Sequence, residues 1–197
     1  MLPVTLALLI ANVAMFMLQM ATGNTPMLWF ALWPVEGGSN MPPFQIWQLV
    51  TYSFLHGGLA HLFFNMFALY MFGSDIERVF GSRWFLIYYT VCVVVAALTH
   101  MVVTAVMGLE PLPTVGASGG MFGLLLAFAM YFPERKLLLI FLPVPLPARV
   151  FVVLYGAVEL FFGVTGTATG IAHFAHLGGM LGGILVIMLR RGKIGRR

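Results

Sequence analysis

Long apolar segments alternate with short polar turns along nearly the whole chain. We predict six such helical segments, which approach or reach the length needed to cross roughly 30 Å of hydrocarbon at about 1.5 Å per residue. They cover residues 2–21, 57–73, 84–107, 116–132, 148–162 and 169–189. The pattern therefore predicts an all-α membrane protein, a six-transmembrane-helix bundle that forms a single core with no soluble domain.

Composition supports a membrane protein over a soluble one. The 197 residues are 61% hydrophobic and 8% charged, whereas soluble domains carry about 25% charged residues. The mean hydropathy is +0.99. The first segment has no basic stretch before it and no clear cleavage site, so we expect a retained helix and not a signal peptide.

The basic residues predict an orientation. With six crossings, all ten fall on the side of the membrane that holds the C-terminal tail, and basic residues near helix ends are kept in the cytoplasm. They are Arg78, Arg83, Arg135, Lys136, Arg149, Arg190, Arg191, Lys193, Arg196 and Arg197. The opposite side has Glu36 and Glu110. We therefore expect both termini to be cytoplasmic, and the pI of about 9.6 reflects topology and not nucleic-acid binding.

Four polar residues are expected to share one depth in the membrane. The second, fourth and sixth segments run from outside to inside, and each carries its polar residues in its first half: His61 and Asn65, Ser118, and His176. His61 and Asn65 are four residues apart and share a helix face. Polar side chains in a membrane usually face the bundle or water, so the pattern indicates one shared site.

Glycines surround the serine and one histidine. Gly179 and Gly183 follow His176 on the same helix face, and Gly119 and Gly123 follow Ser118. Such spacings let helix backbones approach closely in lipid. We expect the sixth segment to lie directly against a neighbouring helix.

These residue types favour serine hydrolysis. A serine hydroxyl needs a base to accept its proton, and His176 is the candidate for Ser118. His61, Asn65 and the main-chain N–H groups of Gly116 and Ala117 could stabilise an oxyanion. No Asp or Glu lies in the outer halves of the second, fourth and sixth segments, so we expect a dyad and not a triad.

Three further polar residues lie near this layer. Glu159, in the fifth segment, must be paired, protonated or near water, and the sequence leaves these alternatives open. His173 is interpreted as a polar residue at the outer end of its helix, although it could contact the site from the next turn. His56 is assigned a structural role.

Three motifs resemble those of the rhomboid family of intramembrane serine proteases. They are His61-x-x-x-Asn65, Gly116-Ala117-Ser118-Gly119 and Ala175-His176-x-Gly178-Gly179, in the family's order, with support from Gly73-Ser74-Asp75-Ile76-Glu77-Arg78 and Gly81-Ser82. The resemblance covers nearly the whole chain. It implies that Ser118 is the nucleophile and His176 the general base, while His61 and Asn65 help to form the oxyanion hole.

The resemblance also implies partners and a location. The substrates would be other transmembrane proteins, cleaved in or near their membrane segments within the lipid bilayer, and the enzyme would use no metal, ATP or other cofactor. We expect a bacterial plasma (inner) membrane, with the active site opening to the outer side. Phe161 and Phe162 are bulky enough to gate a side opening between the second and fifth segments, and we expect the fifth segment and the loop 163–170 to move.

Three rival interpretations remain at this stage. His61, His173 and His176 could bind a metal, although the layer has no cysteine cluster and Ser118 would have no task. A transporter would need a polar route through both leaflets, whereas the inner halves of the segments are apolar. A non-catalytic relative that only binds membrane helices would not need both Ser118 and His176.

Overall fold

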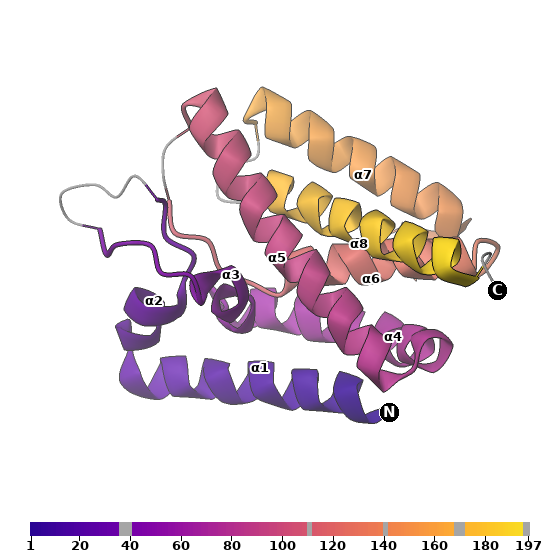
Figure 1. Cartoon of the computed structure of the whole chain (residues 1–197), viewed down its shortest axis with the longest axis horizontal. Coiled ribbons are helices and arrows are strands. Elements are labelled where there is room, and N and C mark those ends of the chain that lie inside the picture. The colour runs from indigo at the N-terminus through magenta and orange to yellow at the C-terminus, as the bar shows by residue number, and fades with distance from the viewer. Residues whose placement is uncertain (36–40, 110–111, 140–141, 168–171, 195–197) are drawn as a thin grey trace.

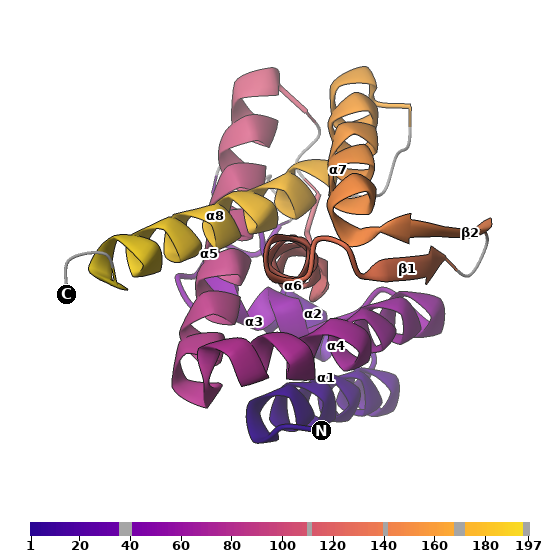
Figure 2. The ribbon, with the colours of Figure 1, turned by 90° about the vertical axis from the view of Figure 1, so that its right-hand side faces the viewer.

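The computed structural model describes residues 1–35, 41–109, 112–139, 142–167 and 172–194. Among these residues helices dominate (Figure 1), and one antiparallel pair of short strands lies between two of them in the chain (Figure 2). In chain order the elements are α1 (Pro3–Thr22), α2 (Thr25–Phe30), α3 (Gln48–Thr51), the 3-10 turn η1 (Tyr52–Phe54), α4 (Leu59–Phe80), α5 (Ser82–Met107), α6 (Ser118–Tyr131), β1 (Lys136–Leu139), β2 (Leu142–Pro147), α7 (Ala148–Thr165) and α8 (His173–Ile194).

Within the described residues, five helices are long and apolar enough to cross a membrane: α1, α4, α5, α7 and most of α8. Many of their large apolar side chains are exposed, such as Val106 and Leu189, as expected where lipid replaces water. The protein is a multi-pass integral membrane protein with the all-α architecture predicted. The start of α1 and the C-terminal end of α8 lie at the same end of the molecule (Figure 1).

One further apolar helix, α6, corresponds to the fourth predicted segment; it is short, and protein surrounds it. Its 14 residues span only about 21 Å at 1.5 Å per residue. It lies among α4, α5, α7 and α8 (Figure 2), and most of its residues are buried. A helix enclosed in this way need not match the thickness of the bilayer, and its first residue, Ser118, lies inside the protein.

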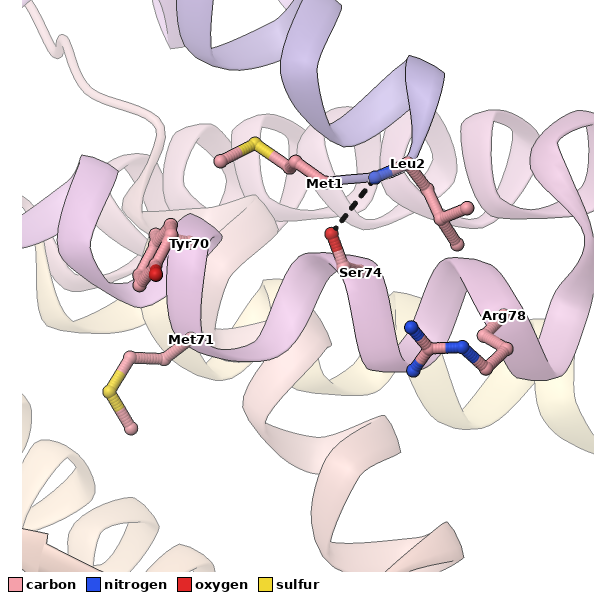
Figure 3. Close-up of a pocket in the computed structure, with 6 residues that line it drawn as sticks. All are labelled: Met1, Leu2, Tyr70, Met71, Ser74 and Arg78. Atoms are coloured by element: carbon pink, nitrogen blue, oxygen red, sulfur yellow. Dashed lines mark hydrogen bonds between the residues drawn. The ribbon is translucent and has the colours of Figure 1, made fainter.

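The buried carboxylate of Glu77 joins α1 to α4. Glu77 of α4 accepts hydrogen bonds from the main-chain N–H groups of Val4 and Thr5 and from the hydroxyls of Thr5 and Ser82, at 2.7–3.1 Å. The main-chain N–H of Leu2 donates to the hydroxyl of Ser74 at 3.2 Å (Figure 3). Because the first N–H groups of a helix have no partner within it, α4 supplies the acceptors that the start of α1 needs.

Some helix bounds differ from the prediction. The second predicted segment ends at 73, but α4 continues to Phe80, since Ile76, Glu77 and Phe80 are buried. Three prolines before α7 prevent helix as expected, and Lys136–Leu139 pairs with Leu142–Pro147 as the antiparallel strands β1 and β2, which the pattern did not predict. The predicted start of the last helix at 169–171 lies outside the described residues.

Candidate active site

Glycines position the serine and histidine helices. Any Cβ at Gly179 of α8 would collide with the main chain of Gly119 of α6, and a Cβ at Gly123 would lie 3.1 Å from the carbonyl oxygen of Gly179. Only glycine allows this approach. Because Gly119 directly follows Ser118 and Gly179 lies three residues after His176, the crossing brings the two functional side chains together.

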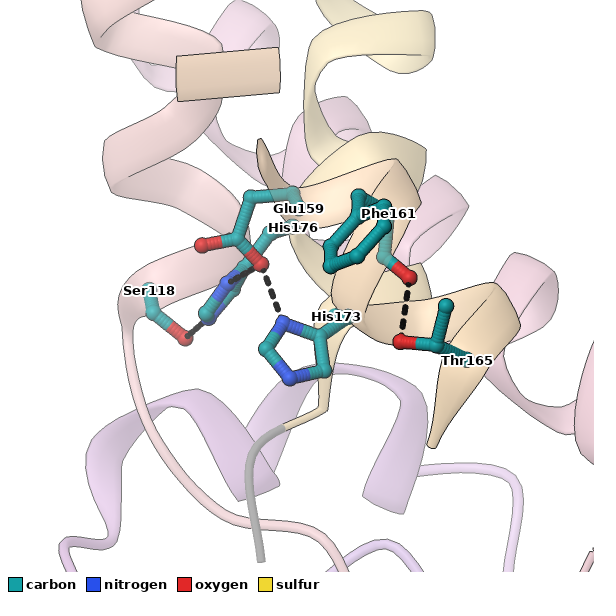
Figure 4. A network of polar contacts seen from close by, with 6 residues as sticks. All are labelled: Ser118, Glu159, Phe161, Thr165, His173 and His176. Atoms are coloured by element: carbon teal, nitrogen blue, oxygen red, sulfur yellow. Dashed lines mark hydrogen bonds and ion pairs between the residues drawn. The ribbon is translucent and has the colours of Figure 1, made fainter. Parts of the chain in front are cut away.

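Ser118 and His176 are in hydrogen-bonding contact. The Oγ atom of Ser118 lies 2.8 Å from Nε2 of His176 (Figure 4). The imidazole is also stacked on Phe122, with ring centroids 4.2 Å apart and an angle of 7° between the planes. Sequence reasoning missed Phe122, although its position four residues after Ser118 places it on the same helix face. The ring of Phe122 limits how far the imidazole can turn.

The expectation that no carboxylate lies within reach of the imidazole of His176 is wrong. An oxygen of Glu159, on α7, lies 2.8 Å from Nδ1 of His176 and 2.7 Å from Nδ1 of His173 (Figure 4). All three side chains are buried. The prediction considered only the three helices that carry the other polar residues, and α7 is a fourth. His173, interpreted as a polar residue at the helix end, is part of this network.

His61 and Asn65 lie on the α4 side of the site. A Cβ at Gly116 would lie 2.7 Å from Nε2 of His61 and 3.8 Å from Oγ of Ser118, so the imidazole edge lies close to the serine. Nδ1 of His61 accepts from the main-chain N–H of Gly57 at 3.4 Å. A neutral imidazole that accepts at Nδ1 carries its proton on Nε2, which leaves an N–H donor near Ser118.

One expected oxyanion donor is already occupied. The N–H of Gly116 donates to the carbonyl oxygen of Tyr52 at 3.0 Å, and Gly116 has a φ of +124°, which favours glycine. The interpretation of Gly116 as a donor is therefore wrong for this conformation. Ala117 is the N-cap residue of α6 and is buried. Its role in binding an oxyanion stays a prediction.

A large cavity opens beside the serine. It has a volume of about 1480 Å³ and is lined by residues of α4, α6, α7 and α8, among them His61, Asn65, Ser118, Phe122, Phe162 and His176. The side chains of His61, Asn65, Ser118 and His176, which the sequence predicted to share a site, thus all line the same cavity. Of the two predicted gate residues, Phe162 lines this cavity, whereas Phe161 is 59% exposed and is not among the lining residues.

His56 lies behind His61 and is held neutral. Its ring is buried and neither nitrogen has a hydrogen-bond partner among the described residues. The centroids of the two imidazoles are 5.1 Å apart. Burial, with a smaller effect from His61, lowers the pKa of His56 from 6.5 to about 4. The uncharged ring of His56 packs against the ring of His61, in line with a structural role.

Among the described residues, one cluster has the composition of a metal site. Potential ligand atoms of Glu159, His173 and His176 all lie within 4.8 Å of one another. However, Glu159 touches both imidazoles directly at 2.7 and 2.8 Å, which are ordinary hydrogen-bond lengths. A metal ion between these atoms would need them to separate, so the contacts favour shared protons.

Comparisons with known proteins agree with these motifs. A family model described as Rhomboid domain matches residues 43–193. Rhomboid protease GluP of Bacillus subtilis (strain 168) is 31% identical over 169 residues, which cover 85% of this chain and 31% of that protein. Rhomboid protease GlpG of Yersinia pestis (strain Pestoides F) and that of Yersinia pseudotuberculosis serotype O:3 (strain YPIII) are each 26% identical over 192 residues, covering 93% of this chain and 61% of those proteins.

The chain spans less than two thirds of the length of each of these relatives. The family match nevertheless covers most of the chain, including α4, α6 and α8 with their histidines and serine. The protein belongs to the rhomboid family.

Proposed function

We propose that this protein is an intramembrane serine endopeptidase, which hydrolyses peptide bonds in or near transmembrane segments of other membrane proteins. The observation that carries the proposal is the 2.8 Å contact between Oγ of Ser118 and Nε2 of His176, on the wall of a cavity inside a membrane bundle. The names of the two kinds of relatives, both rhomboid proteases, support the same activity.

In the first half of the reaction, Oγ of Ser118 attacks the carbonyl carbon of the substrate while its proton passes to Nε2 of His176. The carbonyl oxygen becomes an oxyanion. The side chains of His61 and Asn65 line the cavity, and we assign the N–H of His61 to this oxyanion. Nδ2 of Asn65 already donates one hydrogen to the carbonyl oxygen of His61 at 2.9 Å, so its second N–H is the other donor. Ser118 is also the first residue of α6, so unpaired N–H groups and the positive end of the helix dipole face the developing charge.

Collapse of this intermediate breaks the C–N bond. The proton on His176 passes to the departing amine, and the acyl group remains as an ester on Ser118. Water then attacks the ester carbonyl as His176 accepts its proton, and return of that proton to Oγ releases the acid. The reaction consumes one water molecule per peptide bond and needs no metal, cofactor or nucleotide.

The cavity supports access from the membrane plane. Its lining includes Phe64 and Phe67 of α4 and Phe151, Tyr155 and Phe162 of α7, and an apolar lining of this kind suits a membrane-spanning segment. Within the proposal, Phe162 with the outer part of α7 forms a gate. Residues 168–170 of the loop assigned to this movement lie outside the described residues. If a cross-link between α7 and α4 left cleavage of a transmembrane substrate unchanged, the gate would be wrong.

Charge supports the proposed orientation in a bacterial inner membrane. Arg78 lies in the last turn of α4, Arg149 in the first turn of α7 and Arg190 near the end of α8. These three helix ends lie at the same end of the molecule as the start of α1 (Figure 1). The placement of Glu36, Glu110, Arg196 and Arg197 lies outside the described residues. By the positive-inside rule, that end is cytoplasmic and the serine opens to the outer side.

Cleavage by purified protein tests the proposal. The protein would be reconstituted in vesicles with a fluorescent reporter that contains a transmembrane segment. We expect cleavage by the wild type and none above background by Ser118→Ala or His176→Ala. Cleavage that survives in Ser118→Ala would overturn the function. Cleavage that a chelator abolishes and zinc restores would favour the metal interpretation.

A further inference from the structure

A continuous chain of hydrogen bonds crosses three helices behind the serine. It runs from Oγ of Ser118 on α6 to the ring of His176 on α8, and from that ring to Glu159 on α7. We propose that Glu159 is a positioning residue for His176, so that hydrolysis depends on a serine, a histidine and a glutamate. This inference rests on the proposed function.

With Glu159 ionised, the contacts of its carboxylate determine the proton positions in this series of hydrogen bonds. An ionised carboxylate can only accept hydrogen bonds, so the Nδ1 atoms that lie 2.7 and 2.8 Å from Glu159 must both be donors. A neutral His176 with its proton on Nδ1 has a lone pair on Nε2. That lone pair faces Oγ of Ser118. Glu159 therefore selects the tautomer in which His176 can accept the serine proton.

Glu159 would also stabilise the charge that forms during the reaction. When His176 takes the proton from Ser118 it becomes an imidazolium, and an adjacent buried carboxylate favours that ion. Glu159 is 4% exposed and is not among the residues that line the cavity. It thus acts through His176 and does not touch substrate.

The surroundings of Glu159 agree with this role. A carboxylate within a membrane helix is stable only when it is paired, protonated or near water, and the two imidazoles of α8 supply partners for one oxygen atom. His173 sits one turn before His176 and donates to the same oxygen. This second hydrogen bond holds the carboxylate in place when His176 exchanges protons.

Three variants in the reconstituted cleavage assay test the inference. For Glu159→Gln we expect kcat to fall about 100-fold with KM within twofold of the wild type, since an amide can no longer hold the correct tautomer or the charge. Glu159→Asp keeps a carboxylate that is one methylene shorter, and should recover part of the loss. Glu77→Gln is the matched control, because it neutralises another buried glutamate far from the serine and should leave kcat of the folded protein unchanged.

A spectroscopic measurement gives an independent answer. In the folded, inactive Ser118→Ala protein, ¹⁵N chemical shifts report which nitrogen of His176 carries the proton. We expect a protonated Nδ1 when Glu159 is present, and a mixture of tautomers in the Ser118→Ala protein that also carries Glu159→Gln.

The outcomes separate this inference from the function itself. If Ser118→Ala abolishes cleavage but Glu159→Gln keeps kcat within twofold, the serine protease stands and the role of Glu159 is overturned. If Ser118→Ala still cleaves, the proposed function fails first. If Glu159→Gln does not fold, the tautomer of His176 in the Ser118→Ala protein decides, and a proton on Nε2 alone would refute the inference.

Discussion

Two buried glutamates, Glu77 and Glu159, show that the same side chain can have different roles in two regions of one membrane protein. Glu77 is 1% exposed and Glu159 is 4% exposed, and both lie in helices that could span a membrane. Glu77 is surrounded by main-chain N–H groups and hydroxyls. Glu159 is surrounded by two imidazoles.

The difference lies in what the partners can do with a proton. The donors around Glu77 stay protonated at all ordinary pH values, so that network can only join α1 to α4 and α5. Each imidazole beside Glu159 has two ring nitrogens that can donate or accept a hydrogen bond, and His176 also contacts Ser118. The first region joins three helices, and the second connects a buried carboxylate to the serine, as the proposed proton transfer requires.

The largest effect should follow from disturbing the helix crossing that supports the second region. Gly179→Ala places a methyl group against the main chain of Gly119, so α6 and α8 must separate. We expect cleavage to fall at least about 100-fold, since a shift of about 1 Å in catalytic groups has such consequences, and stability to drop by about 3 kcal/mol.

Gly156→Ala is the control for this prediction. It also adds a methyl group at a helix interface, but at an ordinary 3.6 Å from Sδ of Met180. Its cleavage rate and thermal unfolding in detergent should match the wild type. Equal behaviour of the two variants would contradict the role assigned to the crossing.

Next in size is the loss of the donors on the α4 side of the cavity. His61→Ala and Asn65→Ala should each reduce kcat by about 100-fold, in the range found for single oxyanion-hole donors, with little change in unfolding temperature. Steady-state kinetics on the transmembrane reporter would measure this. A rise in KM at constant kcat would instead assign these residues to substrate binding.

The glutamate of the first region should affect stability and not catalysis. In Glu77→Gln, one carboxylate oxygen that accepts hydrogen bonds is replaced by an NH₂ group that faces donors, and we expect unfolding to become easier by about 3 kcal/mol. Denaturation in mixed micelles would measure the change. Glu134→Gln is the control: it breaks the exposed ion pair with Arg149 and should shift stability by no more than about 0.5 kcal/mol.

The smallest effect concerns pH. His56 has its pKa lowered from 6.5 to about 4 by burial, so between these values the unfolded state binds a proton that the folded state does not. Stability should therefore fall as the pH falls from 7 to 4.5, by about 2 kcal/mol. Unfolding at pH 7 and pH 4.5 should show this loss in the wild type and less of it in His56→Gln; an equal loss in both would contradict the assignment.

The sequence predicted those parts of the molecule that depend on local spacing. Helix positions follow from apolar segments, and His61 with Asn65 share a face because they are four residues apart. The approach of Ser118 to His176 could be predicted because glycines accompany both residues and the positive-inside rule places both in one leaflet. None of these arguments needs a contact between distant segments to be known beforehand.

Glu159 was missed because its partners are 14 and 17 residues away on another helix. Its single clue was an acid in an apolar segment, which indicates a partner but not its identity. The carbonyl of Tyr52 that occupies the N–H of Gly116 also comes from a distant turn. The length of α4 depends on Glu77 being covered by α1. To predict any of these three features, one would have to know which helices are neighbours.

The most direct test of the account is to locate the reactive hydroxyl. Purified protein would be treated with a fluorophosphonate, digested and analysed by mass spectrometry, with Ser118→Ala and His176→Ala in parallel. We expect an adduct on the peptide that contains Ser118, none in Ser118→Ala, and a reaction at least about 100-fold slower in His176→Ala. An adduct on another serine, or equal labelling of His176→Ala, would contradict it.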